Sequence, residues 1–137
     1  MKFYLASDFY HIHVVRAVCN ALQERGHTVT VKWWEDTALH LSKIKSPDAF
    51  YKQESCRLIF ERDKAGIKEA SAFILVAGDT PSLFGGANIE VGIAYGLEIP
   101  VFSVGNLKNS AMYYGVTRCQ SISEILTILS DSKRAKQ

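Results

Sequence analysis

The fold is decided by residues 72–87, AFILVAGDTPSLFGGA, where a continuous apolar run passes into a glycine-rich loop. Residues 72–77 are apolar at every position, which is typical of a central parallel strand, because helices then cover both of its faces. The loop ends in Gly85 and Gly86, and a short helix is expected over 88–98. The stretch therefore predicts a strand, a loop that lets a ligand approach the backbone, and a helix.

On both sides of this unit, short apolar runs alternate with amphipathic stretches. The expected strands lie at 2–7, 28–34, 72–77, 99–104 and about 116–118. The expected helices contain 14–22, run from 47 to about 70, cover 88–98, and close the chain over 121–130. The inward side chains of the long helix would be Phe50, Cys56, Ile59, Phe60 and Ile67. This alternation predicts an α/β fold: a doubly wound, flavodoxin-like or Rossmann-like parallel sheet of five strands with helices on both faces.

Size and composition limit the class of protein. The 137 residues are 47% hydrophobic and 22% charged, which fits one soluble domain over 1–131 followed by a basic, frayed tail over 132–137. A formal charge of +2 argues against nucleic acid or a membrane as partner, and no apolar run approaches the roughly 18 residues of a membrane span. Because residues 1–7 are too short for a signal peptide, the cytoplasm is the expected location. Three widely spaced cysteines favour reduced thiols over disulfides or a metal site.

In doubly wound sheets, ligands bind beyond the carboxyl ends of the strands, where the strand order reverses. This rule places the loops after Ser7, Trp34 and Ala77 around one crevice. Aromatic residues near these strand ends offer stacking surfaces, and the glycines give room beside the backbone. The residues expected to bind substrate there are Ser7, Asp8, Phe9, Trp34, Ser82, Gly85, Gly86 and Asn88.

Glu90 is the first catalytic candidate. It is expected in the opening turn of the helix that follows the glycine-rich loop, at the carboxyl end of the central strand. The helix dipole would keep a carboxylate ionised there, and an ionised carboxylate can act as a nucleophile. An acidic residue in a first turn also stabilises a helix without any other role, so position alone leaves both interpretations open.

Asp63 is the second candidate. On a helix it shares a stripe with Ile59 and Ile67, so it interrupts an apolar, inward face. Partial burial raises the pKa of a carboxyl group, which suits a proton donor near neutral pH. The alternative is a structural ion pair with Arg62 or Lys64.

Three segments together resemble the nucleoside 2-deoxyribosyltransferase family, including its relatives that hydrolyse nucleoside 5′-monophosphates. They are residues 3–9 (FYLASDF), 62–68 (RDKAGIK) and 85–94 (GGANIEVGIA), and residues 99–101 (IPV) match the strand that follows. The resemblance spans nearly the whole chain as far as Gly105, with the segments in the family's order and spacing.

The resemblance implies a double displacement at the anomeric carbon of a nucleoside or nucleotide. Glu90 would attack this carbon and form a glycosyl ester, Tyr4 would orient its carboxylate, and Asp63 would protonate the departing base. Taken alone, a mid-strand tyrosine such as Tyr4 is more often a core residue. Gly92 and Ala94 would keep the helix of Glu90 close to the sheet. The resemblance further implies no metal or other cofactor, a homo-oligomer in which a neighbouring subunit completes the pocket, and a place in nucleotide salvage.

The sequence leaves the substrate open. Residues 69–71 (EAS) lack the aspartate that relatives carry before the central strand, and Leu83 and Phe84 stand where transferases often have another. Residues 80–83 (TPSL) look more like the loop of the monophosphate hydrolases, whereas the first loop lacks an arginine and Asp8 would repel a phosphate. Transfer to a second base, hydrolysis of a nucleoside or monophosphate, a TIR-like NAD glycohydrolase and a nucleotide-binding sensor are all compatible with these residues.

Overall fold

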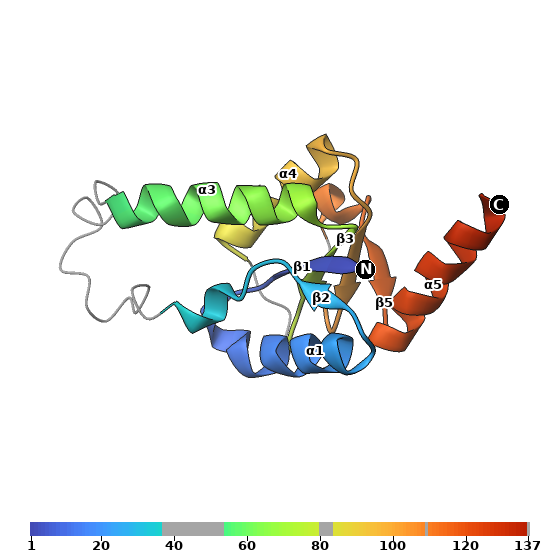
Figure 1. Cartoon of the computed structure of the whole chain (residues 1–137). Coiled ribbons are helices and arrows are strands. Elements are labelled where there is room, and N and C mark those ends of the chain that lie inside the picture. The colour runs from blue at the N-terminus through green and yellow to red at the C-terminus, as the bar shows by residue number, and fades with distance from the viewer. Residues whose placement is uncertain (37–53, 80–83, 109, 137) are drawn as a thin grey trace.

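The computed structural model describes residues 1–36, 54–79, 84–108 and 110–136. Its centre is a five-stranded sheet, whose strands run parallel in the order β2-β1-β3-β4-β5 (Figure 1). The strands are β1 (Lys2–Ala6), β2 (Thr28–Val29), β3 (Ala72–Val76), β4 (Val101–Val104) and β5 (Thr117–Cys119). The predicted parallel sheet of five strands is confirmed.

Helices cover both faces of this sheet. The α-helices are α1 (Ile12–Glu24), α3 (Glu54–Glu69), α4 (Gly86–Gly96) and α5 (Ile122–Ala135). Short 3-10 helices lie in the connections: η1 (Phe9–His11), η2 (Trp33–Glu35) and η5 (Ala111–Tyr113). Figure 1 shows α3 and α4 on one face of the sheet and α1 and α5 on the other. The doubly wound α/β fold expected from the sequence is therefore the observed fold.

The two central strands form the core. Every residue of β3 is buried, and so are Phe3, Tyr4, Leu5 and Ala6 of β1. Tyr4 pairs in register with Phe73, and their rings stack with centroids 5.4 Å apart. Full burial of a large apolar side chain contributes roughly 1.5–3 kcal/mol, so these strands supply much of the stability. Because the ring of Tyr4 is packed in this way, the direction of its hydroxyl group is fixed.

The strand order reverses between β1 and β3, because the chain leaves β1 toward β2 and returns to β3 on the other side. Just beyond the two strands, the hydroxyl of Ser7 donates to the carbonyl of Val76 at 2.6 Å. Diverging connections leave a crevice at this point in such folds. Helix α3 packs closely against the segment after β2 because Gly66 has no side chain: a Cβ there would lie 2.4 Å from Cγ2 of Val31.

The second strand is shorter than the predicted 28–34. Strand β2 ends at Val29, and the chain then turns into η2. The indole Nε1 of Trp33 donates to the carbonyl of Leu5 at 2.7 Å, and its ring meets Trp34 edge-on with centroids 5.6 Å apart. The chain turns over the end of β1 at η2, and this turn buries both tryptophans. The edge strand β2 therefore ends early.

The helix boundaries also differ from the predictions. Helix α4 begins at Gly86 rather than at 88, and the start of the long helix, with Phe50, lies outside the described residues. Helix α5 continues to Ala135 instead of ending near 130, so Lys133 and Arg134, expected in the tail, lie in its last turn. Cations at this end of a helix are favoured by its dipole, which helps to explain the extra length.

Candidate active site

A pocket of about 610 Å³ opens at the carboxyl ends of the central strands, between α3, α4, η2 and the segment after β1. Its volume is within the range of small-molecule sites. Three acidic residues, Asp8, Asp63 and Glu90, line it together with the basic Lys64, and the rest of the lining is mostly apolar. The sequence placed the crevice at these strand ends, and the pocket brings Glu90 and Asp63 together there.

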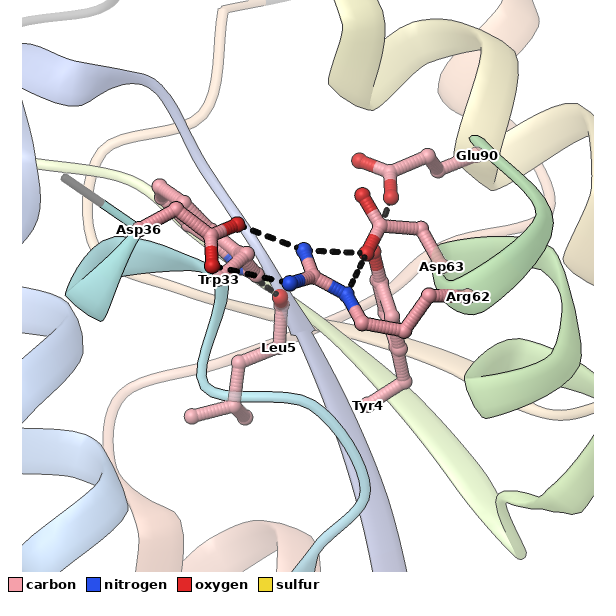
Figure 2. A network of polar contacts seen from close by, with 7 residues as sticks. All are labelled: Tyr4, Leu5, Trp33, Asp36, Arg62, Asp63 and Glu90. Atoms are coloured by element: carbon pink, nitrogen blue, oxygen red, sulfur yellow. Dashed lines mark hydrogen bonds and ion pairs between the residues drawn. The ribbon is translucent and has the colours of Figure 1, made fainter. Parts of the chain in front are cut away.

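Glu90 lies on α4 and accepts a hydrogen bond from the hydroxyl of Tyr4, which rises from the core of β1 (Figure 2). Tyr4 is fully buried, and burial raises the pKa of its hydroxyl above the ordinary value, so the group stays a proton donor. The contact joins the middle of the sheet to α4 and fixes one oxygen of the Glu90 carboxyl group.

The pKa of Glu90 is raised from an ordinary 4.5 to about 7. Burial is the main cause and the nearby Asp63 adds to the rise, whereas the bond from Tyr4 and the charge of Arg62 oppose it. The prediction that the helix dipole keeps Glu90 ionised is therefore wrong. Because α4 begins at Gly86, Glu90 falls in the second turn rather than the first, where the dipole is weaker. Desolvation then has the larger effect.

Asp63 lies on α3 and faces the same pocket. Burial raises its pKa, as predicted, although the adjacent Arg62 opposes this rise. The guanidinium of Arg62 donates to Oδ1 of Asp63 from Nε at 3.0 Å and from Nη2 at 2.9 Å. The sequence offered an ion pair with Arg62 as the alternative to a raised pKa. Asp63 has both: it is paired with Arg62, and its pKa is raised.

The carboxyl group of Asp63 is near enough to Glu90 for its charge to raise the pKa of Glu90. The pKa of each group is raised by burial, so each can hold a proton at higher pH than an exposed carboxyl group does. A site with one ionised and one protonated carboxyl group can supply a nucleophile and an acid at once.

The walls of the pocket are aromatic and aliphatic. Ile59 and Phe60 of α3, which the sequence assigned to a packed inward face, line the pocket instead, and Phe60 is 51% exposed. Phe9 and Trp33 stand on another wall, with their rings edge-on and centroids 5.7 Å apart. These surfaces suit a flat, apolar ring such as a nucleobase.

The remaining predicted binding residues divide into two groups. Ser7, Asp8, Phe9, Gly85 and Gly86 all line the pocket. Oδ1 of Asp8 lies 2.7 Å from Nδ1 of His11 and accepts from the backbone N–H of His11 at 3.1 Å, which holds the first loop in place.

Trp34 and Asn88 do not line this pocket. Trp34 is buried beside a separate cavity of about 150 Å³. Trp33, which the sequence grouped with Trp34 among the aromatic residues near the crevice but did not assign to substrate, lines the main pocket instead. In the strand predicted over 28–34, the adjacent Trp33 and Trp34 would point to opposite faces, and the sequence does not indicate which face borders the crevice. Asn88 donates to the carbonyl of Phe84 and accepts from the hydroxyl of Tyr113, so it braces the start of α4.

Three further predictions have different outcomes. Ser82 lies outside the described residues. Ala94 is fully buried against the sheet, as expected. Gly92 does not keep α4 close to the sheet, because it is exposed and a Cβ there would have nothing within 4 Å.

Within the part of the chain that the structure describes, no group of three or more His, Cys, Asp or Glu side chains is placed to hold a metal ion. Among the same residues, no helix combines the length and apolar character that crossing a membrane requires.

No family model matches the sequence, and no curated protein matches it. The fold is similar to that of a 2-deoxyribosyltransferase from the bacterium Bacillus psychrosaccharolyticus, with a TM-score of 0.63, 23% identity, and coverage of 91% of this chain and 90% of that one. It is also similar to a CMP N-glycosidase from Clostridium botulinum, with a TM-score of 0.59, 16% identity, and coverage of 95% and 99%. These likenesses confirm the fold that the sequence resemblance implies.

Proposed function

We propose that this protein cleaves the N-glycosidic bond of a nucleoside or nucleotide through a glycosyl ester on Glu90, and passes the sugar to a second base or to water. The observation that carries the proposal is the meeting of Glu90 and Asp63 in one pocket, with Tyr4 bound to Glu90. The proteins of similar fold support it, since they are, by name, a 2-deoxyribosyltransferase and a CMP N-glycosidase.

In the first half-reaction, an oxygen of the ionised Glu90 attacks the anomeric carbon of the sugar. The bond between that carbon and the base nitrogen breaks, and its electron pair leaves with the base. Protonated Asp63 gives its proton to the base, which departs neutral, and Asp63 becomes a carboxylate. Tyr4 keeps its proton and holds the Glu90 carboxyl group in line for attack.

In the second half-reaction, the Asp63 carboxylate takes a proton from the acceptor, which is a second base or a water molecule. The acceptor attacks the anomeric carbon, the ester bond to Glu90 breaks, and both carboxyl groups return to their starting states. Two displacements at one carbon retain the configuration of the sugar. The aromatic and aliphatic walls would hold either base while the exchange takes place.

The charge of the pocket favours an uncharged nucleoside over a 5′-monophosphate. Among the described lining residues, Asp8, Asp63 and Glu90 are acidic, and the amine of Lys64 is already 3.1 Å from a carboxylate oxygen of Glu61. A phosphate dianion would meet carboxylates at close range, which is unfavourable in a partly desolvated site. We therefore expect kcat/KM for a deoxynucleoside to exceed that for its monophosphate, and the substitution Asp8→Asn to narrow the difference.

The test is incubation of the purified protein with deoxynucleosides, monophosphates and NAD, with and without an acceptor base, followed by chromatography of the bases. We expect base release that Glu90→Gln reduces by about three orders of magnitude, because an amide is a poor nucleophile. The matched control is Glu69→Gln, an exposed glutamate paired with Lys2 at 2.6 Å, which should leave the rate unchanged.

The other outcomes identify the competing functions. Cleavage of NAD alone would indicate a TIR-like glycohydrolase, and preference for monophosphates a nucleotide hydrolase. If the protein binds nucleosides but wild type and Glu90→Gln release base equally slowly, the protein is a sensor rather than an enzyme. The homo-oligomer, the cytoplasmic location and the place in nucleotide salvage stay predictions.

A further inference from the structure

A chain of contacts ties Asp63 to the central sheet through η2 (Figure 2). The indole of Trp33 donates to the carbonyl of Leu5 in β1 at 2.7 Å, and the backbone N–H of Asp36 donates to the carbonyl of Trp33 at 3.0 Å. The two carboxylate oxygens of Asp36 then accept from Nη1 and Nη2 of Arg62 at 2.8 and 2.7 Å. Such a two-bond pair fixes the plane of the guanidinium group as well as its position.

Arg62 passes this fixed geometry to Asp63. Two of its nitrogens donate to the same oxygen of Asp63, Oδ1, at 3.0 and 2.9 Å. Figure 2 shows the other oxygen, Oδ2, turned toward Glu90. Because Oδ1 already accepts two bonds from a cation, a proton on Asp63 belongs on Oδ2, which is the oxygen that faces the pocket.

A guanidinium group alone would oppose the role of Asp63 as an acid. Its positive charge favours the ionised form of a neighbouring carboxyl group. Here Arg62 is shared between Asp36 and Asp63, so the negative charge of Asp36 partly offsets its positive charge. Arg62 lowers the pKa of Asp63, and Asp36 raises it. The pair thus holds Asp63 through an arginine, while Asp36 offsets part of the lowering that Arg62 causes in the pKa of Asp63.

We propose, on the basis of the proposed function, that Asp36 is a positioning residue, which acts through Arg62 to aim Asp63 and to keep a proton available on it for the departing base. Asp36 has no contact with Glu90 or Tyr4 in the described network, so it would act through Asp63 alone. Tyr4, by donating to Glu90, would act in the same direction from the other side of the pair.

The sign of the effect follows from the charges around Asp63. These groups are Tyr4 of β1, Glu90 of α4, Asp36 at the end of η2, Arg62 and Lys64 of α3, and Asp8 in the lining of the same pocket. Removing the charge of Asp36 leaves Arg62 facing Asp63 uncompensated, so the proton moves toward Glu90 and the productive form becomes rarer. Removing Arg62 instead leaves Asp63 among carboxylates, so its titration moves to higher pH.

The experiment compares Asp36→Asn and Arg62→Met with wild type in the full-length protein. Side-chain carbonyl carbons of aspartate are labelled with 13C and titrated by NMR, with the Asp63 signal assigned by its loss in Asp63→Asn. We expect Asp63 to titrate at lower pH in Asp36→Asn and at higher pH in Arg62→Met. In Asp36→Asn, kcat/KM for base release should fall roughly three- to tenfold and its acidic limb should move to lower pH, since one pKa unit is tenfold in proton affinity.

The matched controls are Glu54→Gln and Arg57→Met, which remove an exposed ion pair from the same helix. Neither should move the titration or the pH profile, and Asp36→Glu, which keeps the charge, should retain the wild-type titration. A loss of activity in Asp36→Asn with the Asp63 titration unmoved would overturn the proposal, because misfolding alone gives that result. If wild type releases no base, the proposed function fails, while the opposite NMR shifts still decide whether Asp36 controls the proton on Asp63.

Discussion

Helices α1 and α3 carry similar apolar stripes, but the stripes lie in different surroundings. On α1, Val18 and Leu22 are buried against the sheet. On α3, Ile67 is fully buried, whereas Phe60, two turns earlier, is 51% exposed and lines the pocket. The carboxyl end of α3 thus packs against the segment after β2, where Gly66 permits close approach, and the earlier turns of α3 face an open pocket. An apolar stripe therefore marks a surface that avoids water, which is either a core or the wall of a binding site.

The difference between the two stripes is a carboxyl group. The stripe of α3 contains Asp63, and the charged residues of α1, Arg16 and Glu24, are exposed. A charge in a packed stripe costs several kcal/mol unless it is paired, so a stripe that tolerates one has space and polar partners beside it.

The largest expected effect comes from removing this carboxyl group. Asp63→Asn should lower base release by roughly 10²–10⁴, the usual contribution of a general acid, with little change in stability. Activity is measured by chromatography of the released base, and folding by urea denaturation. A variant as active as wild type would show that the acid in the stripe is structural.

The two stripes should respond differently to truncation. Leu22→Ala in α1 should cost about 2–5 kcal/mol of stability, because it leaves a cavity in a packed core. Phe60→Ala in α3 should cost less than about 1 kcal/mol, since the ring is half exposed, but should raise KM for the nucleoside. Urea denaturation and initial rates measure both. Equal losses of stability in Leu22→Ala and Phe60→Ala would mean that both stripes are packed in a core, and would contradict the assignment of Phe60 to a pocket wall.

The stability of the protein should depend on pH through Glu90. Its pKa is raised from 4.5 to about 7, so between these values the folded protein keeps a proton that the unfolded chain has released. Stability should therefore fall as the pH rises from 4.5 to 7, by on the order of 3 kcal/mol. Urea denaturation across this range should show the slope in wild type and in Glu69→Gln, and a flatter curve in Glu90→Gln. The same slope in Glu90→Gln would assign it to another group.

Two glycines should have opposite effects on stability, and the smaller is expected at Gly92. Gly66→Ala should destabilise the protein by roughly 1–3 kcal/mol, because its Cβ would lie 2.4 Å from Val31 and push α3 away from the segment after β2. Gly92→Ala should stabilise it by about 0.5–1 kcal/mol, because the Cβ meets open space on an exposed helix surface. Denaturant midpoints measure both. Destabilisation by Gly92→Ala would contradict the second expectation and indicate that something outside the subunit covers this face.

Much of the molecule was predictable because it depends on local periodicity. The apolar run of β3, the repeat in α1 and the loop before α4 fixed the order of elements, and the parallel sheet followed from their alternation. The site was partly predictable for the same reason: a lone aspartate in a stripe and a glutamate after a glycine loop are unusual locally, and Glu90 and Asp63 stand out without any structure.

Other features had no local signal. Trp33 and Trp34 look equivalent in the sequence, and only the turn of η2 over β1 decides that Trp33 enters the pocket. Asp36 reads as an ordinary polar residue, and its link to Arg62 spans 26 positions of chain. Register at an edge strand and ion pairs between distant segments depend on packing, which short-range patterns do not encode.

By itself, the sequence determined the layers of the fold and singled out two candidate carboxyl groups, because apolar periods of two and 3.6 residues and misplaced charges are properties of neighbouring residues. The tertiary structure alone decided that both groups lie in one pocket with raised pKa values. The pKa of Glu90 near 7 and the clamp on Asp63 arise from burial and from charges contributed by β1, η2, α3 and α4 together. Electrostatic energy depends on distance and solvent exposure in space, and neither is set by separation along the chain.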